Sequence, residues 1–223
     1  MAGFFSTDSK LYRFMCRLTD LVKLNFLWLV FSLPIVTIGI STIAAHYVAL
    51  KIAEGQEGYI FSDFIKAFKA NWKQGIPMSF ISVICVWALY LDFQLIANAE
   101  EHPVLFLITG IVAAYIFVFT LLYAFALLAR YDNTLLNTLR NSFNISMRYF
   151  LRTALLVIIV AIELAAMLWS PKTMILILIC GPAFVMLTVC SVAINIFRDI
   201  ESKNPESVER EEPSEQNETE TSE

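Results

Sequence analysis

The sequence predicts an all-α, polytopic membrane protein with four full spans and a broken or re-entrant helical segment near its N-terminus. Of its 223 residues, 58% are hydrophobic and only 16% are charged, whereas soluble domains carry about 25% charged residues. The apolar residues are gathered into long blocks, and the basic residues fall between these blocks. A soluble fold of this length would not need several runs that match a bilayer core of about 30 Å.

Five blocks hold almost no charge, and the last four are long enough for full spans, since a membrane helix needs about 17–25 residues. The first block contains Pro34, which lacks a backbone donor and disfavours helical conformation at Leu33. These features predict a helix break inside the first block. The blocks cover residues 24–36, 76–97, 104–129, 153–169 and 173–197.

The broken segment leaves two arrangements open. The 27 residues between Lys23 and Lys51 give two helical arms of about 13 residues, each about 20 Å long. Such arms suit a re-entrant hairpin, and a helix that begins near Ser9 would lengthen the first arm. The alternative is a single span kinked at Pro34, which gives the protein five straight spans.

The distribution of Lys and Arg favours the re-entrant arrangement. With five straight spans, 5 of the 16 basic residues lie on the side of the N-terminus and 11 lie on the other side. When residues 24–50 enter and return to the same face, 15 lie on that face and 1 on the opposite face. Basic residues concentrate in cytoplasmic loops, so both termini are predicted to be cytoplasmic, in a multi-pass protein of the cell membrane.

The loop after the first segment is predicted to form an amphipathic helix at the membrane interface. Its aromatic residues recur at helical spacing and fall on one face about 100° wide, which we expect to lie in the acyl boundary. Lysines on its flank are expected to contact anionic headgroups of the lipid bilayer. The predicted interface helix comprises Phe61, Phe64, Phe68 and Trp72 with Lys66, Lys69 and Lys73.

The chain divides into a single helical membrane domain, residues 1–198, and a tail, residues 199–223. Within the domain, a second amphipathic cytoplasmic helix is expected after Asp132 or Thr134, and it carries Leu135, Leu139 and Phe143. The tail holds ten of the 20 acidic residues and no aromatic residue. Because it can bury little apolar surface, the tail is predicted to be disordered and cytoplasmic.

The sequence contains no familiar motif for catalysis or cofactor binding. It lacks the phosphate-binding pattern G-x-x-x-x-G-K-[ST] and the patterns H-E-x-x-H and G-x-S-x-G. Its four cysteines and two histidines are scattered without metal-ligand spacing. We therefore expect a protein that is not an enzyme and that has no cofactor, no metal and no nucleic-acid partner.

Polar residues inside the spans form a predicted outer polar cluster, because ionisable groups at membrane depth are costly and often functional. Asp92 and Gln94 belong to the outer half of one span, and Glu163 belongs to the outer half of another. In one interpretation these side chains line an outward cavity for a cation or a polar solute. In the other, they reach water near the headgroups or pair across helices.

Four stretches carry a family resemblance: Asn25-Phe26-Leu27-Trp28, Leu33-Pro34-Ile35-Val36-Thr37-Ile38-Gly39, Asn71-Trp72-Lys73-Gln74 and Ala129-Arg130-Tyr131-Asp132. With them, most of residues 10–198 resemble the bacterial YesL family, membrane proteins that share a domain of unknown function. Members often occur near sugar-import genes, so the resemblance implies an inner-membrane protein associated with carbohydrate uptake. It also implies a sugar permease or a membrane sensor as partner, and it supplies no catalytic residue.

The broken segment is predicted to be the functional core, because breaks in membrane helices persist where they approach a ligand or a partner helix. The sequence and the resemblance together predict a non-enzymatic accessory or regulatory membrane protein. The alternative is a small secondary transporter or channel for a polar solute or cation. The predicted core residues are Asn25, Pro34, Thr37, Gly39, Ser41 and His46.

Overall fold

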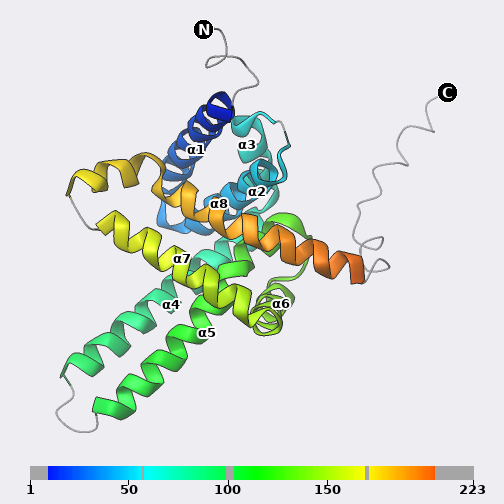
Figure 1. Cartoon of the computed structure of the whole chain (residues 1–223). Coiled ribbons are helices and arrows are strands. Elements are labelled where there is room, and N and C mark those ends of the chain that lie inside the picture. The colour runs from blue at the N-terminus through cyan, green and yellow to red at the C-terminus, as the bar shows by residue number, and fades with distance from the viewer. Residues whose placement is uncertain (1–9, 57, 99–102, 169–170, 204–223) are drawn as a thin grey trace.

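The computed structural model describes residues 10–56, 58–98, 103–168 and 171–203, and nearly all of them are helical (Figure 1). The all-α class predicted from the sequence is confirmed. α8 continues into the predicted tail as far as Lys203, and the rest of that tail lies outside the described residues. The elements are α1 (Lys10–Ser32), the short 3-10 helix η1 (Ile35–Thr37), α2 (Ile38–Glu54), α3 (Ile60–Ala70), α4 (Trp72–Asn98), α5 (Pro103–Arg130), α6 (Leu135–Arg148), α7 (Phe150–Leu168) and α8 (Pro171–Lys203).

Helix length and composition identify the candidate membrane-crossing elements. Four segments of the described chain are long and apolar enough to span a bilayer, and α6 with α7 makes a fifth candidate that is bent by 99°. The first of the four follows the break near the N-terminus. The polytopic architecture is therefore confirmed. The four segments are Ile35–Glu54, Trp72–Asn98, Leu107–Arg130 and Gly181–Lys203.

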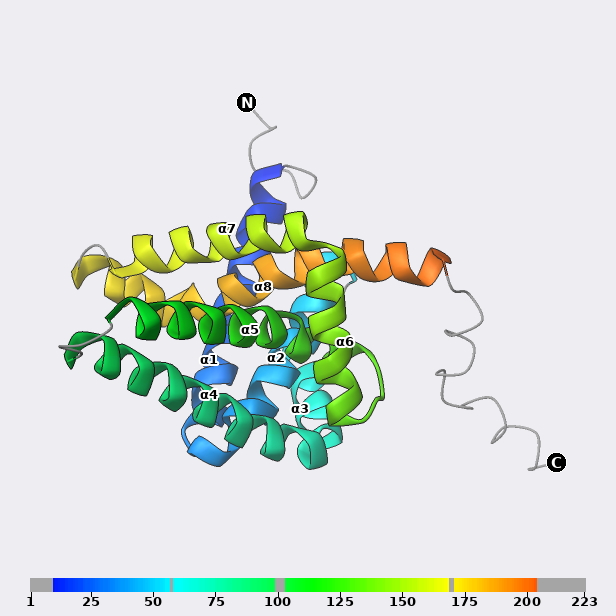
Figure 2. The same cartoon turned by 90° about the horizontal axis from the view of Figure 1, so that it is seen from below.

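Two antiparallel hairpins, α4–α5 and α7–α8, form the body of the protein, and α1 and α2 pack across them. The hairpins diverge from each other in Figure 1, and Figure 2 shows α1 running across α5, α7 and α8 rather than along them. At one end of this body α4 begins, and α5 and α8 stop with Arg130 and Lys203. We call it the basic end, and we call the opposite end, where α4 stops at Asn98, the distal end.

The break predicted at Pro34 is present, and hydroxyl groups satisfy the backbone that it frees. α1 stops at Ser32, and α2 begins only at Ile38. The Thr37 hydroxyl lies 2.7 Å from the carbonyl of Phe31 and 2.7 Å from that of Pro34. An unpaired backbone group in hydrocarbon costs several kcal/mol, so these contacts make the break tolerable at membrane depth.

Glycines allow α2 to lie directly against the first turns of α4. A Cβ atom on Gly39 would stand 2.4 Å from the carbonyl oxygen of Gly75 and 2.7 Å from the backbone nitrogen of Ser79. The Ser79 hydroxyl accepts a hydrogen bond from Gly39 N–H at 2.7 Å and lies 2.9 Å from the carbonyl of Val36. The Ser79 hydroxyl therefore links α4 to the start of α2, both as an acceptor and as a donor of hydrogen bonds.

We expect Ser79→Ala to destabilise the folded protein by about 1–3 kcal/mol, because it leaves the buried Gly39 N–H without an acceptor. Thermal unfolding of the purified protein in detergent measures this effect. Ser82→Ala is the matched control, since among the described residues the Ser82 hydroxyl bonds only to the Met78 carbonyl of its own helix. Equal melting temperatures for the two variants would contradict the role given to Ser79.

The broken segment folds into a helical hairpin, while its second part, Ile35–Glu54, is also long and apolar enough to span a bilayer. Both ends of α2 contact the basic half of neighbouring spans: Gly39 lies beside Ser79, near the start of α4, and Glu54 pairs with Arg130, the last residue of α5. The tip of the segment is apolar and open, and Leu33 is 80% exposed. Such a tip is stable in lipid and costly in water, and the re-entrant and the spanning arrangement both stay predictions.

α3 is the amphipathic helix predicted before α4, but two of its aromatic rings face the protein. Phe64 is fully buried, and the ring centroid of Phe31 in α1 lies 5.4 Å from that of Phe64 and 5.0 Å from that of Phe68. The prediction that Phe64 lies in the acyl boundary is therefore wrong, because α1 covers it, whereas Phe68 is only half-buried. The exposed members of the predicted interface helix are Phe61, Trp72, Lys66, Lys69 and Lys73.

Candidate functional site

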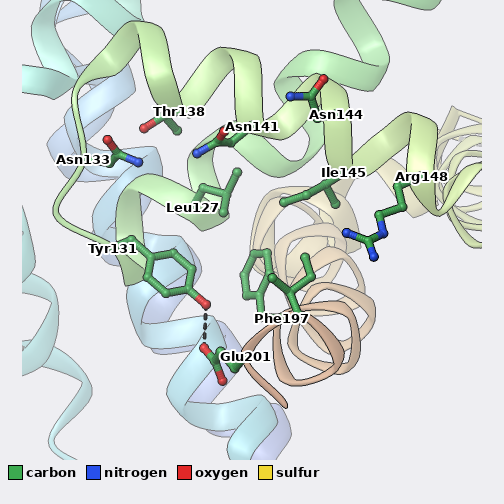
Figure 3. A pocket seen from close by; sticks show the side chains of 11 residues that line it. Leu127, Tyr131, Asn133, Thr138, Asn141, Asn144, Ile145, Arg148, Phe197 and Glu201 are labelled. Carbon is green, nitrogen blue, oxygen red and sulfur yellow. Dashed lines mark hydrogen bonds between the residues drawn. The ribbon is translucent and has the colours of Figure 1, made fainter. Parts of the chain in front are cut away.

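A pocket of about 350 Å³ lies at the basic end, between α6 and the ends of α5 and α8 (Figure 3). Figure 3 shows Tyr131 and Asn133 toward one side of it and Arg148 toward the opposite side. Pockets of about 300–1,000 Å³ with a few placed polar groups are typical of small-molecule sites. The polar lining consists of Tyr131, Asn133, Thr138, Asn141, Asn144, Arg148 and Glu201, and the apolar lining of Leu127, Ile145, Phe197 and Ile200.

The sequence of α6 places a polar stripe on one side of this pocket. The helix is fixed to α5 by two serines, since Ser142 donates to the carbonyl of Thr120 and Ser146 donates to that of Phe119. Small side chains of this kind let helices approach closely. Residues three and four apart share one helix face, and the resulting stripe consists of Asn141, Asn144 and Arg148.

An ion-pair network that includes the pocket-lining residue Glu201 joins three helix ends beside the pocket. Arg130 at the end of α5 contacts Glu54 at the end of α2, with 2.7 Å between Nη1 and Oε1. Its Nε and Nη2 each lie 3.1 Å from Oε1 of Glu201 in α8. Tyr131 donates its hydroxyl to the same oxygen at 2.5 Å. The Arg130 side chain is 24% exposed, so water screens these ion pairs only in part.

The chemistry of the pocket suits binding rather than proton transfer. Burial, together with the hydrogen bond to the Glu201 carboxylate, raises the pKa of Tyr131 above its ordinary value, and the phenol stays protonated at neutral pH. Most other polar groups of the lining are amides, a hydroxyl and a guanidinium, which form directional hydrogen bonds without titrating near neutral pH. Within the described ranges, no cluster of three His, Cys, Asp or Glu side chains is placed to hold a metal ion.

Four residues of the predicted functional core stay in the broken segment, away from this pocket. Pro34 is exposed at the tip, and Thr37 bonds to the backbone beside it. Gly39 packs against α4, and the buried Ser41 hydroxyl lies 2.5 Å from the Ser32 hydroxyl of α1. These four residues shape the turn between α1 and α2 or hold α2 against α1 and α4.

The other two core residues, Asn25 and His46, reach α8. The Asn25 side-chain oxygen accepts a hydrogen bond at 3.3 Å from the backbone N–H of Ala183, the residue after Pro182. His46 is buried in the middle of α2, and its backbone carbonyl lies 3.6 Å from the thiol of Cys190. His46 also borders an apolar cleft that is separate from the basic-end pocket.

The predicted outer polar residues are divided between the two hairpins. Asp92 and Gln94 belong to α4, where Asp92 lies near Gly110 of α5 and Gln94 donates a hydrogen bond within α4. Glu163 belongs to α7 and accepts a hydrogen bond from Thr188 of α8 at 2.8 Å. Its second carboxylate oxygen is buried without a hydrogen-bond partner among the described residues. The structure thus pairs Glu163 across helices and places Asp92 elsewhere.

The basic-end pocket itself was missed by sequence reasoning. A usable signal was present, because Asn141, Asn144 and Arg148 recur at helical spacing on a helix whose neighbouring stripe is small and buried. The partners from other helices left no local signal, since Arg130 and Glu201 are 71 residues apart. Spacing along α6 can predict the polar stripe, but only the fold shows that the ends of α5 and α8 lie beside it.

Comparison with known proteins supports the family resemblance. Residues 21–93 match a family model described as "Protein of unknown function, DUF624". The chain is 29% identical over 145 residues to the "Uncharacterized protein YesL" of Bacillus subtilis (strain 168), covering 63% of this chain and 68% of that protein. No solved structure gives a significant match. The chain therefore resembles the YesL family, and the matched region runs from α1 into α4.

Proposed function

We propose, with the resemblance to the YesL family as premise, that this protein is a non-enzymatic accessory or regulatory component of carbohydrate uptake in the bacterial inner membrane. The observation that carries the proposal is the polar pocket at the basic end. Its amides, hydroxyls and guanidinium can bind a polar ligand or a polar loop of a partner. A sugar permease or a membrane sensor is the partner that the resemblance implies.

The position of Glu201 supports a regulatory role. This residue lines the pocket, and its carboxylate also accepts hydrogen bonds from Arg130 and Tyr131. A group that binds in the pocket and competes for Glu201 weakens the tie between α5 and α8, and with it the link from Arg130 to Glu54. Binding in the pocket thereby changes the stability of the contacts that hold the ends of α2, α5 and α8 together. A ligand that binds the tied and the untied arrangement with different affinity shifts the balance between them, as regulation requires.

The orientation that we propose puts the basic end and both termini in the cytoplasm, because Lys and Arg concentrate there. The exposed lysines of the interface helix then face anionic headgroups of the inner leaflet. In a variant without native cysteines, we expect Lys69→Cys and Arg140→Cys to react with an impermeant maleimide only after cells are permeabilised. Asn98→Cys is expected to react in intact cells, and labelling of Lys69→Cys from outside would contradict this topology.

We expect Asn141→Leu to reduce recovery of the partner about three- to tenfold, since one hydrogen bond is worth about 0.5–1.5 kcal/mol. The measurement is mild crosslinking in native membranes, followed by quantitative mass spectrometry of the proteins that copurify. Asn137→Leu is the matched control, because it makes the same change at an exposed position of α6 outside the pocket lining. Equal recovery of a permease or sensor with both variants would remove the pocket from the proposal.

A further inference from the structure

A second cavity, of about 540 Å³, lies in the cleft between the two hairpins. Five helices line it: α4 and α5 on one side, α7 and α8 on the other, and α2 through a single residue. Of the thirteen described residues that line it, twelve are aliphatic, aromatic or sulfur-containing, among them Cys85, Phe117, Leu121 and Val185. An apolar cavity of this kind does not hold ordered water, and in a membrane its neighbours are lipids.

The thirteenth is His46, which has the one strongly polar side chain among these described lining residues. Its side chain is held in place: Nδ1 lies 2.8 Å from the carbonyl of Thr42, and the ring stacks on Phe125 with 5.7 Å between centroids. A carbonyl only accepts hydrogen bonds, so Nδ1 carries the proton of that contact. In the neutral ring Nε2 is then an acceptor, and the described residues give it no hydrogen-bond partner.

We propose that this cleft binds a lipid alcohol, a membrane-dissolved molecule whose long apolar chain ends in a hydroxyl group that donates to Nε2 of His46. The cleft is bounded by membrane-crossing helices, so its occupant enters from the bilayer. A hydroxyl group in hydrocarbon pays a large penalty unless it finds a partner. His46 removes that penalty, whereas an alkane or the chain of an ordinary ester lipid leaves Nε2 unpaired. This binding is independent of the basic-end pocket.

The test uses the full chain in nanodiscs with a photoactivatable hexadecanol as the probe. We expect crosslinks on the cleft-lining segments of α4, α5 and α8. Unlabelled hexadecanol is expected to displace them about three- to tenfold better than hexadecane, the ratio that one neutral hydrogen bond supplies. Crosslinks spread evenly over the exposed faces of α4 and α7, or equal competition by alcohol and alkane, would overturn the proposal.

Two variants test separately the contribution of the cavity and that of the His46 side chain to binding. His46→Phe keeps a ring of similar shape and is expected to abolish the preference for the alcohol. Val185→Phe fills the cleft from α8, leaves His46 in place, and is expected to remove the labelling. Ile84→Phe is the control, because this residue is exposed on α4 outside the cleft. If His46→Phe keeps the alcohol preference, or if Val185→Phe labels like the control, the assignment is wrong.

Discussion

Gly39→Leu is expected to prevent stable folding of the protein and to abolish its activity in cells. A leucine Cβ at this position meets the Gly75 carbonyl at 2.4 Å and the Ser79 hydroxyl at 2.6 Å. The nearest of these atoms is backbone, which cannot move without separating α2 from α4. Overpacking of a close contact costs about 1–3 kcal/mol and more when backbone must shift. The loss of the Gly39–Ser79 hydrogen bond adds to this cost.

The measurement is the yield of monodisperse protein in detergent, together with its melting temperature. Gly110→Ala is the control, because a Cβ there meets the flexible end of Ile96 at 3.2 Å and the Asp92 Cβ at 3.8 Å, an ordinary contact distance. We expect the control to accumulate normally and Gly39→Leu to aggregate or to be degraded. A Gly39→Leu protein that melts with the wild type would show that the α2–α4 contact opens at little cost, and the packing described for the broken segment would be wrong.

Arg130→Met is expected to lower the melting temperature by about 5–10 °C. Methionine retains much of the length of the side chain but removes the charge that Glu54 and Glu201 share. Removing one member of a buried ion pair costs about 3–5 kcal/mol. Partial exposure of these side chains lowers our expectation to about 2–3 kcal/mol, which for a chain of this size gives the stated shift.

A double-mutant cycle tests whether the network is the cause. Adding Glu201→Gln to Arg130→Met is expected to recover part of the lost stability, because one of two uncompensated carboxylates is neutralised. Arg130→Lys should fall between the variants, since lysine keeps the charge but lacks the planar fork that contacts two carboxylates. The control is Arg140→Met, at an exposed position of α6. If Arg130→Met and Arg140→Met melt alike, Arg130 does not hold the helix ends together.

Local features of the fold could be predicted because they depend on a few neighbouring residues. Pro34 predicts the break through its own ring and its missing N–H. The apolar blocks 76–97 and 104–129 locate α4 and α5 to within a few residues of Trp72–Asn98 and Pro103–Arg130. The aromatic spacing after residue 60 predicts α3 in the same way.

The partner of each apolar face could not be predicted, and the reason is physical. Lipid tails are as apolar as a leucine-rich helix, so hydrophobic periodicity cannot tell a lipid-facing surface from a buried one. Helical spacing therefore predicts a lipid contact for Phe64, while the structure buries this ring against Phe31. Contacts across long distances in the sequence, such as Arg130 with Glu54 or Asn25 with Ala183, likewise leave no local pattern.

The hairpin of α1 and α2 also sets the order in which the protein can be completed during synthesis. α1 and α2 are made first, but contacts of Asn25 and His46 wait for Ala183 and Cys190, which follow 158 and 144 residues later. At about 5–20 residues per second, the ribosome needs roughly 10–30 s to supply them. A chain interrupted before α8 lacks the contacts of Asn25 with Ala183 and of His46 with Cys190. The packing of α1 and α2 is therefore complete only after α8 has been synthesised.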